Sequence, residues 1–236
     1  MVKNHLKRIN APKRWNILRK NYKFISRPNP GRDLSLSISL NTVLKEMLNK
    51  TKTTKETKYL LKNQGVMVNG VKRYDDKFPV GFLDVVSFPS TKEYFRILID
   101  KKNKMFVLSI KEDESKLKLS KLIDKKDLSK EKVQFNCSDG RNFIVKRGDK
   151  LLADAKTNDS LLYAIPENKI TQVLKLEKGA LVYLYKGKHV GLIVVVDDFK
   201  EGNIVFKEGK DVFETKSEYA FAVGKGKPVI TIPQEK

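Results

Sequence analysis

The stretch QGVMVNGVKRY, residues 64–74, places an Asn-Gly step between two short runs in which apolar residues alternate. A type I′ turn needs positive φ at both of its central residues, and Asn and Gly adopt that conformation most readily. The stretch therefore predicts a tight β-hairpin that turns at Asn69 and Gly70. Two cations, Lys72 and Arg73, follow the turn and give the hairpin a basic exit.

Two helical patterns precede this hairpin. Apolar residues recur at helical spacing over 40–48, which predicts an amphipathic helix. TTKE, residues 53–56, has the pattern of a capping box and predicts the start of a second helix that ends near Gly65. Lysines repeat along this second helix every three or four residues, so they share one face. This lysine stripe consists of Lys55, Lys58 and Lys62.

The composition of the chain points to a polyanionic partner. Among 236 residues, 49 Lys and Arg outnumber 28 Asp and Glu, so the formal net charge is +21. A charge of this size is typical of proteins that bind nucleic acid. A membrane is the less favoured partner, because the longest apolar run, LIVVV at 192–196, is far shorter than a membrane-spanning helix. The length favours two or three small domains over one.

The sequence contains no recognisable motif of an enzyme active site. The chain has two histidines, His5 and His189, and one cysteine, Cys137, and it contains no CxxC, HExxH or Walker loop. We therefore predict no catalytic residue, no metal site, no cofactor and no small-molecule substrate. Cys137 alternates with apolar residues in VQFNC and is expected to lie in a core. A single cysteine and an N-terminus without the apolar core of a signal peptide indicate a cytosolic protein.

The N-terminal segment is expected to be a basic arm. Residues 1–32 contain ten Lys or Arg and no Asp or Glu. Aromatic residues interleave with these charges, namely Trp15, Tyr22 and Phe24. Because aromatic rings stack on unpaired bases, we expect the arm to fold onto nucleic acid and to lack a core of its own without it.

The order helix, helix, hairpin and strand over 37–90 resembles the small RNA-binding domain named after bacterial small-subunit ribosomal protein four. The resemblance is carried by TKYLLKNQGVMVNGVKR and FPVGFLDVVSF, in which a further strand is expected at about 82–88. In that family the second helix and the hairpin share a surface that grips the RNA backbone. Arginines are more usual in the family's helix. The lysines of this chain keep point-charge contacts with phosphate but not bidentate ones.

A second resemblance lies near the C-terminus. KGALVYLYKGKHVGLIVVVDDF, residues 178–199, resembles the KOW motif of ribosomal and transcription proteins, and Gly187 matches the central glycine of that motif. Glycine suits a position where a Cβ would be disfavoured. Between the two motifs, YFRILID, MFVLSI, VQFNC and NFIVK predict short strands of a spacer domain.

Both motifs, together with HLKRINAPKRW at 5–15 and GKGKPVITIP at 224–233, resemble the archaeal and eukaryotic four-e family of small-subunit ribosomal proteins. The resemblance implies an α+β, multidomain protein that binds ribosomal RNA, contacts neighbouring ribosomal proteins and supports subunit assembly and translation. The expected parts are a basic arm (1–36), the small RNA-binding domain (37–90), a central β-rich domain (91–172), a KOW-type, SH3-like β-barrel (173–224) and a C-terminal tail (225–236).

Two other functions stay open at this point. Pseudouridine synthases and other RNA-modifying enzymes carry the same small RNA-binding domain, but they need a sizeable catalytic domain as well. A transcription elongation factor with a KOW barrel would leave the arm unexplained. On the ribosomal interpretation, the residues expected to contact RNA are Lys7, Arg8, Lys13, Arg14, Trp15, Arg19, Lys20, Arg27, Arg32, Lys55, Lys58, Lys62, Lys72, Arg73, Lys186, Gly187, Lys188 and His189.

Overall fold

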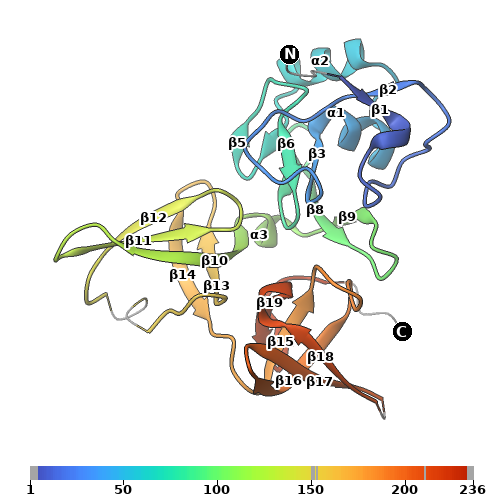
Figure 1. Ribbon diagram of the computed structural model, residues 1–236. Coiled ribbons are helices and arrows are strands. Elements are labelled where there is room, and N and C mark those ends of the chain that lie inside the picture. The colour runs from blue at the N-terminus through green and yellow to red at the C-terminus, as the bar shows by residue number, and fades with distance from the viewer. Residues whose placement is uncertain (1–4, 150–151, 153, 210, 233–236) are drawn as a thin grey trace. The chain divides into compact units, whose positions relative to one another are not determined.

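The computed structural model describes residues 5–149, 152, 154–209 and 211–232. The chain divides into two compact units, Met1–Lys116 (unit 1) and Leu117–Lys236 (unit 2). Strands predominate in both units and helices are few (Figure 1). The expectation of a multidomain chain with both helices and strands is met in this coarse form, with the balance strongly toward β-structure.

Unit 1 is built on a five-stranded antiparallel sheet in the order β5-β4-β7-β8-β9. The hairpin strands are β4 (Met67–Val68) and β5 (Val71–Lys72), and the others are β7 (Val85–Phe88), β8 (Glu93–Ile99) and β9 (Met105–Ser109). Asn69 and Gly70 have φ of 51° and 74°, which confirms the predicted turn. Strand β8 pairs with β7, so the domain boundary expected at residue 90 would cut a continuous sheet; unit 1 instead runs to Lys116.

Unit 1 also contains a small two-stranded sheet of β3 (Ser37–Ser39) and β6 (Pro79–Gly81). The first predicted helix is one turn of α-helix, α1 (Leu40–Thr42), followed by a π-helical turn, η2 (Val43–Met47). The second is α2 (Thr54–Asn63), and its capping box is confirmed, because the Thr53 side chain accepts from the Glu56 backbone N–H at 3.2 Å. A short helix, α3 (Glu112–Ser115), ends the unit.

The strand expected at about 82–88 is shorter than predicted. Residues 82–84 form a turn in which Leu83 has a φ of 63°, and β7 begins only at Val85. The Asp84 N–H donates to the Gly81 carbonyl at 3.1 Å within this turn. The apolar run FPVGFLDVVSF therefore supplies two separate strands, β6 and β7, rather than one.

The N-terminal segment is packed on unit 1 and is not an independent arm (Figure 1). It contains β1 (Leu6–Lys7), a 3₁₀ turn η1 (Arg8–Asn10) and β2 (Phe24–Ile25), and β1 pairs with β2. Trp15 is completely buried, and its indole N–H donates to the Ser37 carbonyl at 2.9 Å. The Met105 N–H donates to the Arg14 carbonyl at 2.8 Å. The expectation that this segment lacks a core without nucleic acid is therefore wrong.

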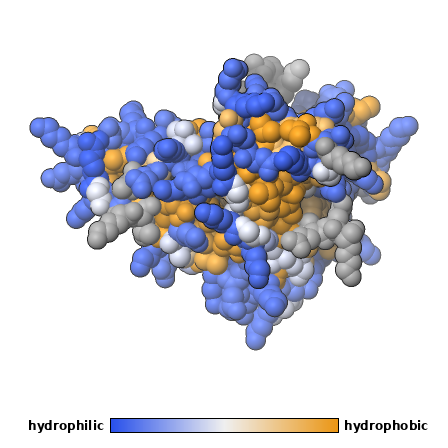
Figure 2. All heavy atoms as spheres, turned by 90° about the horizontal axis from the view of Figure 1, so that it is seen from below, coloured by the Kyte–Doolittle hydropathy of each residue, from blue (hydrophilic) through white to orange (hydrophobic). Residues whose placement is uncertain are grey.

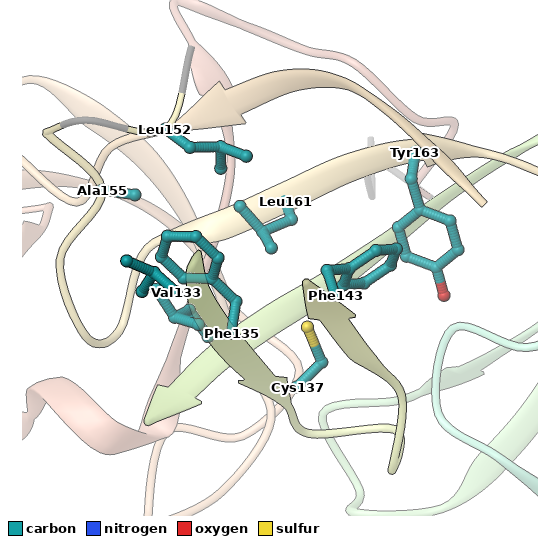
Figure 3. Close-up of a cluster of buried hydrophobic side chains, with 9 residues drawn as sticks. Val133, Phe135, Cys137, Phe143, Leu152, Ala155, Leu161 and Tyr163 are labelled. Carbon is teal, nitrogen blue, oxygen red and sulfur yellow. The ribbon is translucent and has the colours of Figure 1, made fainter. Parts of the chain in front are cut away.

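Unit 2 contains a five-stranded antiparallel sheet in the order β12-β11-β10-β13-β14. Its strands are β10 (Leu117–Asp127), β11 (Lys132–Cys137), β12 (Asn142–Lys146), β13 (Ser160–Ala164) and β14 (Lys169–Leu174). Strands β11 and β12 flank SDGR as the sequence predicts. Figure 3 shows the apolar cluster of this sheet, in which Val133, Phe135 and Cys137 of β11 meet Phe143, Leu161 and Tyr163.

Cys137 is a core residue, as the sequence predicts. It is 5% exposed, and burial, with Asp139 as a lesser cause, raises the pKa of its thiol to about 12. A thiol with this pKa is almost wholly protonated at neutral pH, so it is inert as a nucleophile or metal ligand.

The second sheet of unit 2 has six strands in the order β18-β17-β16-β15-β19-β20. These are β15 (Ala180–Leu184), β16 (Ile193–Lys200), β17 (Asn203–Glu208), β18 (Asp211–Lys216), β19 (Ala220–Lys225) and β20 (Lys227–Pro228), with a 3₁₀ turn, η3 (Ser217–Tyr219), before β19. Val182, Val196, Ile204 and Phe206 are among the residues that form its core. The strands expected from NIVFKEG, VFETKSEY and AFAVG are confirmed.

A buried lysine connects β10 to the segment that enters β19. The Lys121 Nζ donates to the carbonyls of Ser217, Glu218 and Ala220 at 2.9, 2.8 and 2.8 Å. Burial lowers the pKa of Lys121 to about 7, and the carboxylate of Glu218 opposes this shift. An ammonium has three donors, so these three carbonyls use its full capacity and hold the two sheets of unit 2 together at this point.

Replacement of Trp15 by Ala tests whether the N-terminal segment is anchored by its own core. The change removes a fully buried indole and leaves the Ser37 carbonyl without its donor, so we expect a loss of about 3–5 kcal/mol of unfolding free energy. Trypsin should cleave the basic segment of W15A rapidly but that of the wild type slowly. Leu18→Ala, at a position 70% exposed, is the control and should behave as wild type. Immediate loss of the segment from otherwise intact wild-type protein would contradict the packing described here.

Candidate nucleic-acid interface

One buried carboxylate positions the hairpin. Asp84 has no exposed surface, and it accepts hydrogen bonds from the Asn69 Nδ2 at 2.9 Å and the Gly81 N–H at 2.8 Å. It also forms an ion pair with Arg32. The Asn69 Oδ1 in turn accepts from the Val85 N–H at 3.0 Å. Asn69 thus does more than tolerate positive φ: its side chain ties the turn to β7.

The lysine stripe of α2 is exposed to solvent, as the sequence predicts. Lys55, Lys58 and Lys62 all lie on the open side of the helix. The Lys58 Nζ lies 3.7 Å from the Asp76 Oδ1, so this carboxylate partly compensates the charge of Lys58. Tyr59 lies among these lysines and is 68% exposed.

The two cations at the hairpin exit have different environments. Lys72 is exposed, and its Nζ lies 5.1 Å from the ring centroid of Tyr74, which is itself 64% exposed. Arg73 is half-buried, and its guanidinium lies 4.3 Å from the ring centroid of Phe78. Arg73 is therefore partly committed to packing, whereas Lys72 presents its ammonium group to solvent beside an aromatic ring.

Several basic residues of the N-terminal segment are used inside unit 1. Arg8 is 3% exposed; it pairs with Glu46 and donates to the Leu18 carbonyl at 2.7 Å. Arg19 donates to three backbone carbonyls, those of residues 9, 11 and 12, at 3.2, 2.8 and 2.9 Å. Arg32 pairs with Asp84 as described. These arginines stabilise the fold of the segment, so we do not count their guanidinium groups among the candidate RNA contacts.

The remaining predicted residues of this segment divide in the same way. Trp15 is in the core, where a base cannot reach its ring. Arg14 is half-buried. The side chains that stay exposed are those of Lys7, Lys13, Lys20 and Arg27. They are the positions of the segment that a phosphate backbone can approach.

The loop between β15 and β16 in unit 2 presents one clearly exposed cation, Lys188. Lys186 is half-buried, with its Nζ 5.7 Å from the ring centroid of Tyr185. His189 is half-buried; its ring centroid lies 5.5 Å from that of Phe206 and 4.6 Å from that of Phe213. The histidine thus packs on phenylalanines rather than projecting as a free loop contact.

Gly187 has the backbone conformation that its match to the KOW motif leads one to expect. Its φ is +88°, and a Cβ built there would lie 3.0 Å from the Tyr219 Cδ2. Both the left-handed backbone and the close ring therefore favour glycine at this position.

Sequence reasoning missed the exposed tyrosines beside the lysines. Tyr59 is four residues after Lys55 and three before Lys62, so helical spacing alone puts it on the face of the stripe. Tyr74 directly follows the hairpin cations. Aromatic rings next to unpaired lysines are the combination that binds single-stranded or unstacked nucleotides.

Two other kinds of site, a metal centre and a membrane-spanning helix, find no support in the part of the chain that the structure describes. There, no three His, Cys, Asp or Glu residues gather in a way that could hold a metal ion. Nor does any described helix have the length and apolar character needed to cross a membrane. Hydrophilic residues cover much of the face seen in Figure 2.

Comparison with known proteins gives matches along nearly the whole chain. The chain is 37% identical to the small ribosomal subunit protein eS4 of Methanosphaera stadtmanae, over 98% of this chain and 96% of that protein. It is also 37% identical to the eS4 of Methanocaldococcus jannaschii, over 98% of both chains. The chain belongs to the eS4 family.

Two family models and a solved structure agree with this assignment. Residues 91–170 match the model described as ribosomal family S4e, and residues 2–31 match the RS4NT (NUC023) domain. The crystal structure of the 30S ribosomal protein S4e from Thermoplasma acidophilum is similar, with a TM-score of 0.69 and 27% identity, covering 81% of this chain and 96% of that one. The segment that sequence reasoning treated as a spacer is thus the one that the family model matches. The RNA-modifying enzyme is not supported.

Replacement of Asp84 by Ala tests the carboxylate that positions the hairpin. The change leaves the Arg32 guanidinium and the Asn69 amide without their common acceptor in a buried place, which costs about 3–5 kcal/mol. Urea unfolding measures the loss. Asp113→Ala, at an exposed position of α3, should change the unfolding free energy by less than about 0.5 kcal/mol. Equal stability of the two variants would show that Asp84 does not organise this region.

Comparing Gly187→Ala with Gly202→Ala separates two causes of lost stability in unit 2: backbone strain at positive φ and steric contact of the new Cβ. Gly202 has a φ of +82° but no atom within 4 Å of a built Cβ, so alanine there meets only backbone strain of about 1 kcal/mol. At Gly187 the same strain is joined by the contact with Tyr219, and we expect a further loss of roughly 1 kcal/mol or more. Thermal unfolding of both variants checks the order; a smaller loss at Gly187 would refute it.

Proposed function

We propose that this chain is a structural component of the small ribosomal subunit, where it binds ribosomal RNA and supports subunit assembly and translation. The observation that carries the proposal is identity of 37%, over nearly the full length, to relatives named as small ribosomal subunit proteins. The net charge of +21 supports it, because a charge of this size is typical of proteins that bind a polyanion. The function needs no turnover and no cofactor, and it places the protein on ribosomes in the cytosol, beside other ribosomal proteins.

The RNA-binding surface of unit 1 is proposed to be the exposed face of α2 and the hairpin exit. Lys55, Lys62 and Lys72 are exposed, and Tyr59 and Tyr74 lie among them. Lysines neutralise phosphate as point charges, and exposed rings accept bases that leave the stack. This is the surface that the small RNA-binding domain would use, in line with the resemblance of residues 37–90.

Unit 2 is proposed to contribute a second contact through its six-stranded sheet, taken as the KOW-type barrel. The positive φ of Gly187 and the exposure of Lys188 support this assignment. The exposed cations of the N-terminal segment, Lys7, Lys13, Lys20 and Arg27, add phosphate contacts on unit 1. Binding of this kind follows RNA shape and backbone charge rather than base sequence.

Sedimentation tests the proposed function directly. Cell lysate is separated on sucrose gradients at high and low magnesium, and fractions are probed for this protein. Magnesium holds the subunits together, so the protein should move with whole ribosomes at high magnesium and with the small subunit at low magnesium. Its presence in the free protein fractions at both concentrations would refute the proposal.

A salt titration tests the lysine surface. Replacing Lys55, Lys62 and Lys72 by Ala should weaken binding to a small-subunit rRNA transcript and lower the slope of log affinity against log salt by roughly two units, since each lost phosphate contact contributes ~0.7–0.9. The control replaces three scattered exposed lysines, Lys102, Lys156 and Lys169, and removes the same charge. Stability should barely change in either variant. If both triple variants lose affinity and slope equally, only net charge matters and the α2 surface is not the contact.

A further inference from the structure

A groove in unit 1 lies between the N-terminal segment and the helical turns that follow β3. Its volume is about 520 Å³, within the range of sites for small ligands. Residues 22–26 and Arg8 line one part of it, and residues from 41–46 and 52–54 line the rest. None of the lysines of the α2 stripe takes part, so the groove is separate from the surface proposed above.

Three buried side-chain atoms of the groove have no hydrogen-bond partner among the described residues: the Arg8 Nε, the Ser26 Oγ and the Asn41 Oδ1. Arg8 and Asn41 are 3% and 5% exposed. The Asn41 amide makes one side-chain hydrogen bond, from its Nδ2 to the Thr54 Oγ1 at 3.4 Å, so one end of the amide is left over whichever way it is turned. Buried polar atoms normally have partners, and these point to a ligand with both donors and acceptors.

Aromatic rings form part of the same groove. Tyr22 is 66% exposed and Phe24 is 50% exposed. The Phe24 ring is held from one side by the edge of His5, at a centroid distance of 5.5 Å. The Arg8 guanidinium lies 5.7 Å from the Tyr22 ring centroid. The Lys23 Nζ lies 5.5 Å from the Phe24 ring centroid. Two exposed rings beside cations suit the stacking of a planar base next to a phosphate.

The charge of the groove is positive. Lys23, Lys45 and Lys52 line it, and the carboxylate of Glu46 is neutralised by its ion pair with Arg8. Thr53 and Thr54, at the N-terminus of α2, also line the groove, and the capping box of Thr53 and Glu56 already satisfies that end of the helix. An anionic group is therefore favoured beside the aromatic rings and the unpartnered polar atoms.

We propose that this groove binds one unstacked nucleotide of RNA. The base lies against Phe24 or Tyr22, and its polar edge faces the part of the groove that Arg8 and Asn41 line. The phosphate lies near the lysines of the rim. The groove thus offers aromatic rings for the base, polar groups for its edge and lysines for the phosphate. This assignment rests on the proposed function and deepens it, because it adds a contact with a base to contacts with the backbone.

The test compares two variants of the full chain, Phe24→Ala and Asn41→Leu, with wild type and with Ile144→Ala. Ile144 is 62% exposed and lies in unit 2, outside the groove. Three RNAs serve as probes: a small-subunit rRNA transcript, a single-stranded oligonucleotide, and a fully paired blunt-ended duplex of the same base composition. Fluorescence anisotropy over a range of salt concentrations gives the affinity and its salt slope.

Both groove variants should bind the transcript and the single strand at least about fivefold more weakly, which is the smaller effect of losing one base–aromatic stack. Their salt slopes should stay as in wild type, because neither change removes a charge. Binding to the paired duplex should be unchanged, since its bases stay stacked. I144A should match wild type with all three RNAs.

Two outcomes overturn the assignment. If wild type binds the transcript and both groove variants bind as I144A does, the groove is not a nucleotide site, as would be so for a groove that holds a peptide. If wild type fails to bind the transcript, the proposed function itself falls and the groove assignment falls with it. Thermal unfolding of each variant is measured alongside. Should N41L be less stable, the result for F24A, at a half-exposed position, decides alone.

Discussion

The buried carboxylate of Asp84 is the interaction on which the basic face of unit 1 depends. It joins three segments: the N-terminal segment through Arg32, the hairpin through Asn69, and the end of β6 through the Gly81 N–H. A carboxylate removed from water is stable only if its oxygens are satisfied, so all three donors must be in place together. The same contacts that neutralise Asp84 therefore tie the turn of the hairpin to the N-terminal segment and to the end of β6.

The cations of this chain fall into two populations with different roles. Buried ones are matched by acceptors, as in the pairs Arg8–Glu46, Arg96–Glu114 and Lys118–Asp139. Lys121 is matched by three carbonyls instead of a carboxylate. These groups rigidify the units. Exposed cations such as Lys55, Lys62 and Lys72 contribute to the positive surface charge that favours RNA. A tally of Lys and Arg cannot separate the two groups, because burial is decided by distant parts of the chain.

Local sequence rules predicted the local elements well. The turn at Asn69 and Gly70, the capping box of α2 and the strand pairs around SDGR and KKNK all follow from contacts between residues close in the chain. Two of the errors concern partners far apart in sequence. Trp15 was expected to stack on RNA but donates to Ser37, and the predicted boundary at residue 90 divides strands β7 and β8 that are paired. In each case a long-range contact overrode a sound local interpretation.

By itself, the sequence determined the elements, the excess of positive charge and, through its motifs, the family. Turn, cap and strand preferences act over a few neighbouring residues, and net charge is a sum over the sequence. Both can therefore be predicted without knowledge of the fold. Only the tertiary structure decided which side chains remain available. It buries Trp15 and Arg8, exposes Tyr59 beside the lysine stripe, and leaves the Asn41 amide with an unpartnered end in a groove. Whether a side chain is available for binding depends on which residues pack over it. Those residues come from segments far apart in the chain, and local sequence patterns do not predict such contacts.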